Sequence, residues 1–393
     1  MTVKSKYEMR GVSATKSEVH DAIKHLDKGL YPTAFCKILP DIVAGDPDFC
    51  NIMHADTAGT KTSLAYMYWR ETGDMSIWSD IVQDAIVMNT DDMGCVGCVD
   101  NIVISSTIGR NKHLISGEII AALIRGASSF FEGMKSLGVG IHLAGGETAD
   151  VGDIVRTLDV GYTTFARMRK EALVINTIRP GDVIVGLSSS GQASYETRYN
   201  SGIGSNGLTA ARHDVLNKQY RSKYPEAFDP NTPEAYTFTG SRSLLDKVKT
   251  DYGTFTVGQL LLSPTRSYLP LLKKILDAAQ DKIHGIIHCT GGGQTKVLKF
   301  VDQVHIIKDQ LMDIPPVFQL IQEESGTSWQ EMYQVFNMGH RLEFYLDEKE
   351  ASTLIDIAAS MHVDAQIIGR VEKAENRHLT IQSPYGTFQY SEG

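Results

Sequence analysis

The sequence predicts a two-domain protein in which helices and strands are mixed. Its 393 residues, 42% of them hydrophobic and 22% charged, suffice for two domains of ordinary size with their own cores. Helical and strand-like apolar patterns succeed each other along the chain, without a low-complexity tract or a short repeat. Pro180-Gly181 is a strong turn signal in front of a new apolar strand. We therefore expect domains at residues 1–178 and 179–393.

Three segments of the N-terminal half have apolar residues at helical spacing. Residues 15–30 follow a candidate N-cap, Thr15 or Ser17, and the apolar stripe of this helix is Val19, Ile23 and Leu26. The other two expected helices are 76–93 and 117–136, the second stopped by Gly138. Strands are expected at 51–54, 139–144 and 154–164, with Gly145-Gly146 turning the chain out of the second.

The C-terminal half begins with an apolar strand at 182–187 and a turn rich in serine and glycine. From about 195 to 258 the sequence is polar, rich in tyrosine and weakly periodic, which we interpret as an insertion or an extended surface segment. A helix at 268–280 and a strand at 283–288 then lead to the turn Thr290–Gly293. Strands and helices alternate over the last third of the chain.

Charge and composition exclude several classes of protein. A net charge of −9 and a sequence pI of about 5.7 do not give the broad basic surface that nucleic-acid binding needs. Residues 1–11 are polar and lack the apolar region of a signal peptide. No apolar run approaches the roughly 20 residues of a membrane span. We therefore expect a soluble, cytoplasmic protein that binds neither nucleic acid nor membrane.

The five cysteines do not suggest a disulfide framework, because their number is odd and they are spread over a long chain. Cys95 and Cys98 form a C-x-x-C, but no second ligand pair or thioredoxin-like context accompanies it. Buried structural thiols are the favoured interpretation, with a redox or zinc site as the alternative. The remaining cysteines are Cys36, Cys50 and Cys289.

Small-residue turns follow apolar strands at three places: LAGGET at 143–148, GLSSSG at 186–191 and CTGGG at 289–293. Such turns let the backbone approach a ligand and point N–H groups at an anion, although glycine turns also simply end strands. A Walker A motif is absent, and GIGSNG at 202–207 follows no apolar strand, so a P-loop and a Rossmann site are both disfavoured. A nucleotide would bind outside those two folds.

A second constellation is acidic. Asp91 and Asp92 close the helix 76–93, where a carboxylate faces the negative end of the helix dipole and two carboxylates repel each other. A divalent cation such as Mg²⁺ would reverse both costs. Asp56 opens a separate turn with Thr60 and Lys61 close behind, a combination that suits a metal–phosphate site as well as it suits an ordinary solvated loop.

The histidines are less informative. His54 and His288 each end an apolar strand, and a structural role is the favoured interpretation for both. His284 and His288 lie four residues apart on an expected strand, roughly 13 Å, too far to share one zinc. H-E-x-x-H and G-x-S-x-G motifs are absent, which argues against a zinc protease and a serine hydrolase.

Taken in order, these motifs resemble the AIR synthase (phosphoribosylformylglycinamidine cyclo-ligase) family over about residues 7–370. Any one match is weak, whereas this many in the same order are specific. The matching segments are Tyr7, Gly11 and Val12, DTAGTK at 56–61, Asp91–Met93 with Gly97, GGETAD at 145–150, Ser189–Gly191, Ser205–Gly207, PTRSY at 264–268, HCTGGG at 288–293 and EMYQVFNMG at 331–339.

The chain departs from the family pattern at several positions. Thr57 stands where the family has a glycine, and Asp91 where it has an asparagine. Residues 192–204 separate two motifs that are nearly contiguous in the family. The family's N-I-P-R after the TGGG turn is replaced by QTKVLKF, 294–300.

Two departures remove positive groups. Gln334 stands in place of an arginine, and Gly204 in place of a histidine beside S-N-G. Their loss could change how a substrate phosphate is held, and Arg198, Lys296 or Lys299 are the candidates to replace them.

The resemblance implies an α+β fold of two AIR-synthase-like domains. The N-terminal domain would form an intersubunit β-barrel in a homodimer, and the C-terminal domain an α/β sandwich. ATP would bind at a cleft between domains and subunits, with Mg²⁺, beside a small-molecule ribonucleotide. The implied reaction is ATP-dependent ring closure in purine biosynthesis.

The resemblance also implies roles for individual residues. Lys61 and Asp92 would be catalytic, and Asp56 and Asp92 would bind Mg²⁺, with Asp91 as a further candidate. The implied ATP site is Asp56, Thr60, Lys61, Gly145, Gly146, Glu147 and Thr148. The implied ribonucleotide site is Ser189, Ser190, Gly191, Ser205, Asn206, Gly207, Thr290, Gly291, Gly292, Gly293 and Asn337. Lys24 or Lys28 would reach the site from the N-terminal segment.

Two alternatives remain. Another ATP-using relative on the same scaffold, of the selenophosphate synthetase or thiamine-monophosphate kinase type, is the first. A selenophosphate synthetase needs a reactive cysteine in a mobile loop, whereas Cys36 lies in the apolar AFCKI and is expected to be buried. A non-catalytic nucleotide-binding paralogue is the second, suggested by the departures at Gln334 and Gly204.

Overall fold

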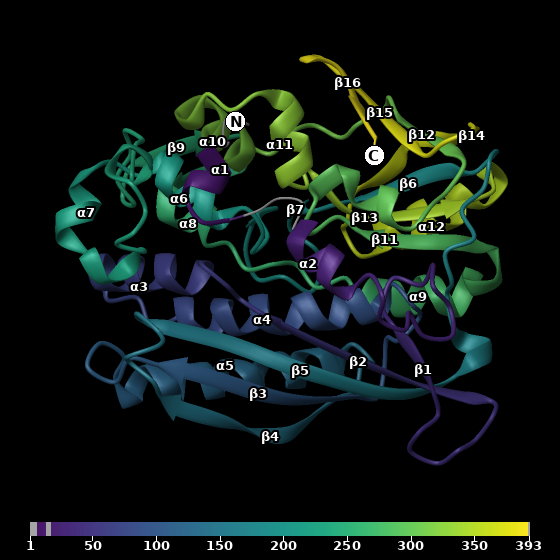
Figure 1. Ribbon diagram of the computed structural model, residues 1–393, viewed down its shortest axis with the longest axis horizontal. Coiled ribbons are helices and arrows are strands. Elements are labelled where there is room, and N and C mark those ends of the chain that lie inside the picture. The colour runs from purple at the N-terminus through teal and green to yellow at the C-terminus, as the bar shows by residue number, and fades with distance from the viewer. Residues whose placement is uncertain (1–5, 13–16, 392–393) are drawn as a thin grey trace.

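The computed structural model describes residues 6–12 and 17–391 and confirms two domains of mixed helices and strands (Figure 1). The N-terminal sheet has the strand order β1-β2-β5-β3-β4. Its only parallel pair is β3 with β4. The strands are β1 (Ile38–Pro40), β2 (Phe49–Thr57), β3 (Ile102–Arg110), β4 (Ile141–Asp150) and β5 (Leu158–Arg169).

One face of this sheet is covered by helices, and α4 is the central one. The helices are α3 (Lys61–Thr72), α4 (Ile77–Gly94) and α5 (Gly117–Ser136). Fifteen of the 18 residues of α4 are buried, because the sheet packs on one side of it and the C-terminal domain on the other (Figure 1). Polar side chains of α4 must therefore find partners inside the protein.

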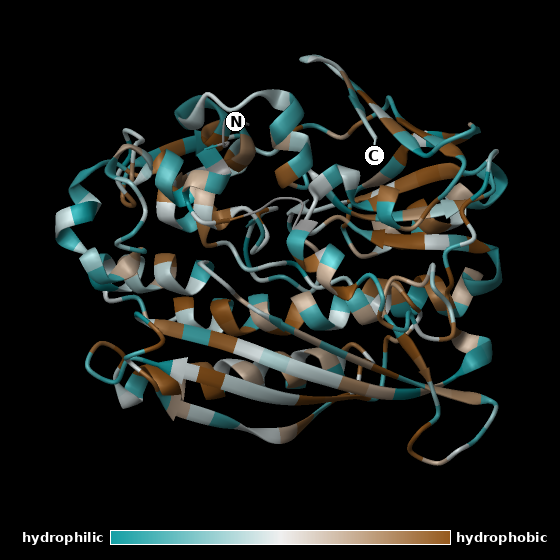
Figure 2. Ribbon diagram, viewed as in Figure 1, coloured by the Kyte–Doolittle hydropathy of each residue, from teal (hydrophilic) through white to brown (hydrophobic). Residues whose placement is uncertain are grey.

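The C-terminal sheet has seven strands in the order β11-β13-β6-β14-β12-β15-β16, and Figure 2 shows hydrophobic residues along its central strands. The strands are β6 (Val183–Ser188), β11 (Ile283–His288), β12 (Val304–Lys308), β13 (His340–Leu346), β14 (Ala365–Lys373), β15 (His378–Ser383) and β16 (Gly386–Tyr390). Helices α9 (Leu269–Ala279) and α12 (Ala351–Ser360) pack together in a core with β6, β11 and β13, and α9 also contacts α4.

Shorter elements complete the chain. The α-helices are α1 (Lys6–Met9), α2 (Ser17–Ile23), α6 (Leu208–Val215), α7 (Gln219–Lys223), α8 (Val257–Leu261), α10 (Pro316–Ser325) and α11 (Trp329–Val335). The strands are β7 (Ser190–Gly191), β8 (Asn200–Ser201), β9 (Lys247–Thr250) and β10 (Gly253–Thr256). The 3-10 helices are η1 (Lys170–Ala172), η2 (Pro225–Ala227), η3 (Glu234–Tyr236), η4 (Gln280–Lys282), η5 (Gly293–Lys299) and η6 (Glu348–Glu350).

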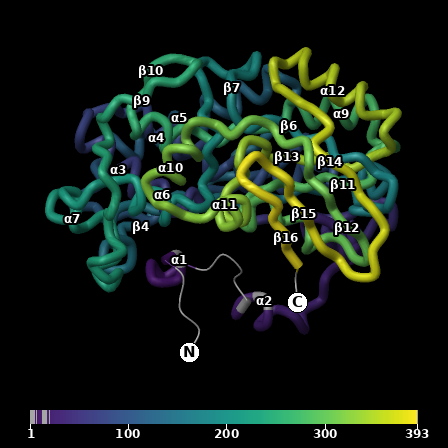
Figure 3. The backbone as a smooth tube through the Cα atoms, turned by 90° about the horizontal axis from the view of Figure 1, so that it is seen from above, coloured from purple at the N-terminus to yellow at the C-terminus, as the bar shows by residue number. Residues whose placement is uncertain are grey.

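The long helices and most strands lie where the sequence predicts them, but three predictions are wrong. Gly145-Gly146 does not end its strand, because β4 continues to Asp150 with a register shift opposite Ile104–Ser106. The expected helix 15–30 shrinks to α2, which lies on the outside of the molecule in Figure 3. Its apolar residues Val19, Ile23 and Leu26 are about half exposed, 48–55%. Thr15 lies outside the described residues.

The third error concerns residues 195–258. It is not an extended surface segment, because it forms α6, α7 and the β9–β10 hairpin and buries Leu208, Tyr220 and Phe238. Its aromatic residues pack on each other and reach Tyr66 of α3 through Tyr224. Weak periodicity hid this core because the helices are short and separated by turns.

Candidate functional site

The C-terminal end of α4 carries a carboxylate, Asp92, between two histidines from different domains. His288 at the end of β11 places Nδ1 2.7 Å from Asp92 Oδ1. His54 of β2 places Nε2 3.3 Å from Asp92 Oδ2. His288 is fully buried, whereas the His54 side chain keeps 23% exposure. The structural roles expected for both histidines therefore centre on one acidic group.

Charge at this bridge follows from burial and hydrogen bonding. Burial raises the pKa of Asp92, but the hydrogen bonds from His288 and His54 outweigh it and hold the pKa well below its usual range. Burial lowers the pKa of His288, and hydrogen bonds to Asp92 and Asn89 raise the pKa of His54 against burial. The bridge thus consists of a carboxylate, a neutral His288 and a His54 that favours its charged form.

Asp56 lies on β2, two residues beyond His54 and on the same face of the strand. It is part of the strand, although the sequence predicts that it opens a turn. Its charge helps to raise the pKa of His54, so Asp56 and Asp92 act on the same imidazole. Two carboxylates that act on one partly exposed imidazole are donors of the kind that Mg²⁺ uses together with water.

Asp91 and Lys61 lie away from this bridge. Asp91 is fully buried and accepts hydrogen bonds from Ser267 Oγ (3.2 Å) and the Tyr268 backbone N–H (2.9 Å), so it holds the C-terminal domain and offers no open face to a cation. Lys61 is fully buried as well and donates to Asp84 Oδ1 (2.8 Å) and Ser263 O (2.6 Å). In this conformation its ammonium group has no exposed surface with which to reach a phosphate.

The buried Lys61–Asp84 pair joins α3 to α4 within the N-terminal domain, and both of its side chains also bind the C-terminal domain. Asp84 Oδ1 also accepts hydrogen bonds from the backbone N–H and the hydroxyl of Thr265, 2.8 and 2.5 Å away. A second contact joins Thr60 to Thr209 of α6, whose hydroxyl oxygens are 2.6 Å apart. The turn 56–61 is therefore fixed to the residues that follow the S-N-G motif.

The predicted ribonucleotide turns converge around residues 336–337. Asn337 Oδ1 accepts from Ser189 Oγ (2.8 Å), and Asn337 Nδ2 donates to Gly202 O (2.9 Å). Gly207 has φ +78°, and a Cβ there would lie 2.4 Å from the ring of Phe336, so only glycine fits. A small cavity is shared by Gly204, Asn206, Thr290, Asn337 and other residues of these turns.

The PTRSY motif supports one of these turns. Arg266 Nη1 donates to Ser188 O (2.9 Å) and Ser190 O (3.0 Å), and the Tyr268 hydroxyl donates to Ser188 O (2.8 Å). The guanidinium is paired with Glu196, 2.7 Å away. In the sequence these residues are identified only by the match to the family motif. Their hydrogen bonds in the structure show that they position the turn at Ser188–Ser190.

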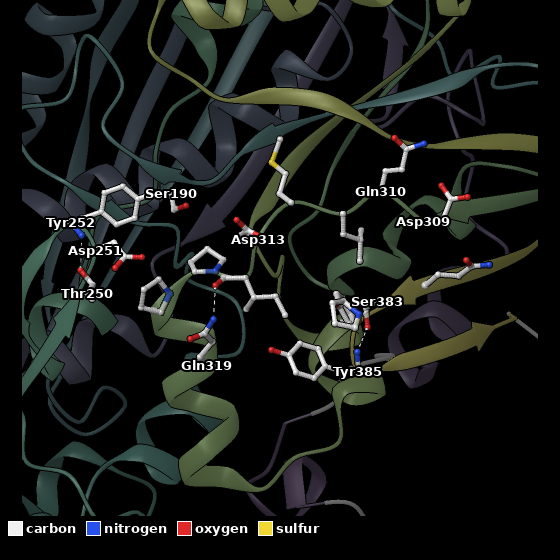
Figure 4. A pocket seen from close by; sticks show the side chains of 18 of the residues that line it. Ser190, Thr250, Asp251, Tyr252, Asp309, Gln310, Asp313, Gln319, Ser383 and Tyr385 are labelled. Carbon is white, nitrogen blue, oxygen red and sulfur yellow. Dashed lines mark hydrogen bonds between the residues drawn. The ribbon is translucent and has the colours of Figure 1, made fainter.

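A larger cleft of about 820 Å³ is lined by Ser190 and by residues of the C-terminal domain (Figure 4). Its charged lining residues are Asp251, Asp309, Asp313 and Lys249, so acidic groups outnumber basic ones. This balance disfavours a phosphate, and the turns around Asn337 fit an anionic ribonucleotide better.

The GGET segment lies far from Asp56 within one chain. It is part of the edge strand β4, three strand spacings or about 14 Å from β2. Glu147 is in register with Thr107, Gly161 and Thr57 across the sheet. Asp56 precedes Thr57 on β2, so its side chain points to the other face. Because paired positions share a face, Glu147 points to the sheet face opposite α4. One chain does not bring Gly145–Thr148 to the Asp92 bridge.

Other sequence-based candidates are placed as follows. Arg198 pairs with Asp80, and Lys296 lies 5.4 Å from the ring of Phe35. All five cysteines are buried and free, in keeping with structural thiols. Among the described residues, the group with metal-ligand spacing is Asp182, His284 and Asp347. The Arg179 guanidinium already lies 3.0 Å from the His284 ring.

Comparison with known proteins decides the family. The model of the AIR synthase related protein, N-terminal domain, matches residues 38–168, and that of the C-terminal domain matches residues 179–382. The chain belongs to the AIR synthase related family. Phosphoribosylformylglycinamidine cyclo-ligase of Methanocaldococcus jannaschii is 30% identical over 329 residues, 82% of this chain and 79% of that protein. The cyclo-ligase of Methanococcus maripaludis strain C5 is 29% identical over 366 residues, 92% of this chain and 86% of that protein.

Two solved structures share the fold. PurL of Thermotoga maritima, complexed with ADP, superposes with a TM-score of 0.54 at 14% identity over 95% of this chain, which spans 47% of that protein. AaThiL, complexed with AMPPCP and TMP, gives a TM-score of 0.52 at 12% identity over 96% of both chains. At this identity the likeness shows the architecture alone. Within the described residues, every helix is too short or too polar to cross a membrane.

Proposed function

We propose that this chain is an ATP-dependent cyclo-ligase that converts formylglycinamidine ribonucleotide to aminoimidazole ribonucleotide with release of ADP and phosphate. One observation carries the proposal: Asp92 lies between His54, two residues before Asp56, and His288, two residues before the turn Thr290–Gly293. One carboxylate thus connects the predicted nucleotide end of the site to the predicted ribonucleotide end. Phosphoryl transfer requires that these two ends be held together.

The proposed reaction has two steps. The γ-phosphoryl group of ATP passes to the amide oxygen of the substrate, which converts a poor leaving oxygen into phosphate. The amidine nitrogen then attacks the activated carbon, the carbon–oxygen bond breaks, and phosphate leaves as the ring closes. The protein contributes position more than covalent chemistry. Arg266 and Tyr268 hold the turn at Ser188–Ser190. The domains are held together by the hydrogen bonds of Lys61 to Ser263 and of Asp84 to Thr265.

Asp56 and Asp92 are the residues that would hold Mg²⁺ in this proposal. When bound, the ion neutralises phosphate charge. Asp91 is left out of the ligand set because it is fully buried, whereas the Asp92 side chain keeps 12% exposure. Lys61 becomes a positioning residue, since it has no exposed surface.

We further propose that the protein acts as a homodimer that packs through its N-terminal sheets. The uncovered face of the N-terminal sheet carries an apolar row, Met53, Phe165 and Val103, paired across three strands. Met53 is 61% and Val103 39% exposed, which is unusual for large apolar side chains side by side. Glu147 points from the same face, so a second copy packed there would cover it.

The direct test combines the purified protein with ATP, Mg²⁺ and formylglycinamidine ribonucleotide and measures ADP and the aminoimidazole product. Stoichiometric formation of both supports the proposal. ADP formed only with selenide or thiamine monophosphate would assign another activity of the same scaffold. ATP binding without turnover on any of these substrates would indicate a non-catalytic paralogue.

A further inference from the structure

One arginine is buried without an ionic partner beside the predicted ribonucleotide turns. Arg341, the second residue of β13, is 1% exposed. Its Nε donates to His288 Nε2 (3.3 Å) and its Nη2 donates to Arg266 O. The guanidinium carbon lies 5.2 Å from the ring centroid of Tyr268. These contacts hold the group firmly and fix its direction.

The third nitrogen of this guanidinium has no partner. Nη1 is buried and makes no hydrogen bond, and no carboxylate of the described chain lies within ion-pair distance of Arg341. Asp91 is near enough for its charge to interact with the guanidinium, but its oxygens are used by Ser267 and Tyr268. A buried charged group with an unused hydrogen-bond donor destabilises the folded protein unless an anion binds to that donor.

The position of Arg341 indicates which anion would do so. Arg341 lines the small cavity that it shares with Gly204, Asn206, Thr290 and Asn337. This cavity measures about 10 Å³, room for one water or one ligand oxygen. It opens among turns whose exposed member is Asn206, so the rest of a ligand would lie outside it.

We propose that Arg341 binds a phosphoryl oxygen of the ligand through Nη1 and is the anion-recognising residue of these turns. This inference rests on the proposed function for the identity of the ligand, a sugar phosphate. It also accounts for a departure from the family pattern, because Gly204, which stands in place of a histidine, borders the same cavity. The positive charge is supplied from β13 instead.

Binding of ribose 5-phosphate and of Mg-ADP to the full chain, measured by calorimetry, tests the proposal. Arg341→Met should weaken ribose 5-phosphate binding at least about thirtyfold, since removal of one partner of a buried charged contact commonly has this effect or a larger one. Arg341→Lys keeps the charge but not the reach of Nη1 and should weaken it about tenfold. Arg212→Met removes a different buried arginine, bonded to Ser63 and Ala227, and should change affinity less than about twofold.

The two phosphate sources are distinguished by the second ligand. A loss confined to ribose 5-phosphate supports a sugar-phosphate site, and a loss confined to Mg-ADP supports the phosphoryl contact but assigns it to the nucleotide. Unchanged affinity for both ligands in folded Arg341→Met or Arg341→Lys overturns the proposal. Turnover of the unaltered protein is measured in parallel, so that failure of this inference is separable from failure of the proposed activity.

Discussion

Removal of the Asp84 carboxylate should destabilise the protein at the domain contact around Lys61. Both side chains of this pair are fully buried, so solvent does not screen them. Breaking such a pair by removing one partner costs about 3–5 kcal/mol, because the other charge stays buried without compensation. Burial already lowers the pKa of Lys61 in spite of Asp84. Without the carboxylate, the pKa of Lys61 should fall further.

The assay is urea unfolding followed by circular dichroism, with the double variant as control. Asp84→Ala should lower the free energy of unfolding by about 3–5 kcal/mol. Lys61→Met with Asp84→Leu should lower it by only about 1–3 kcal/mol, the cost of leaving the Thr265 donors without an acceptor. A loss below about 1 kcal/mol in Asp84→Ala, or a double variant less stable than the single one, would refute this reasoning.

Three further predictions concern the bridge, a turn and the sheet face. NMR titration should give His54 a pKa above its ordinary 6.5, and Asp92→Asn should lower that pKa. The stability that the His54–Asp92 contact contributes is present below pH 6.5 and is lost as pH rises through the raised pKa. Gly207→Ala should lower the melting temperature by an amount equivalent to about 1–3 kcal/mol, because its Cβ would displace Phe336; an unchanged melting temperature would contradict this. Met53→Asp should turn a dimer into a monomer by light scattering, and an unaltered mass would argue against the proposed interface.

Periodicity identified the long elements because their faces differ in polarity. The helix expected at 117–136 coincides with α5, and that at 76–93 is displaced by one residue in α4. The same signal misled at 15–30, where the apolar stripe exists but the described chain leaves it half exposed. A stripe shows that a face is apolar and does not show what covers it.

The site was predicted less well because its key contacts join distant parts of the chain. The sequence shows that Asp92 is a carboxylate in an unfavourable position at the end of a helix. It does not show the histidine partners, because they lie 38 residues before and 196 residues after Asp92. Nothing in the local sequence separates Asp91 from Asp92, yet Asp91 binds the Tyr268 backbone whereas Asp92 binds two histidines. Arg341 carried no signal at all, since an arginine in a strand is ordinary until its burial is known.

The central claim is that Asp92 unites a cation-dependent nucleotide site with the ribonucleotide turns. The most direct measurement is the rate of aminoimidazole formation by Asp92→Asn at saturating ATP, Mg²⁺ and formylglycinamidine ribonucleotide, with Asp91→Asn as the matched neighbour. The account predicts a fall of at least about a hundredfold for Asp92→Asn with an intact circular dichroism spectrum, and near-normal turnover for Asp91→Asn. Unaltered rates in folded Asp92→Asn would contradict it.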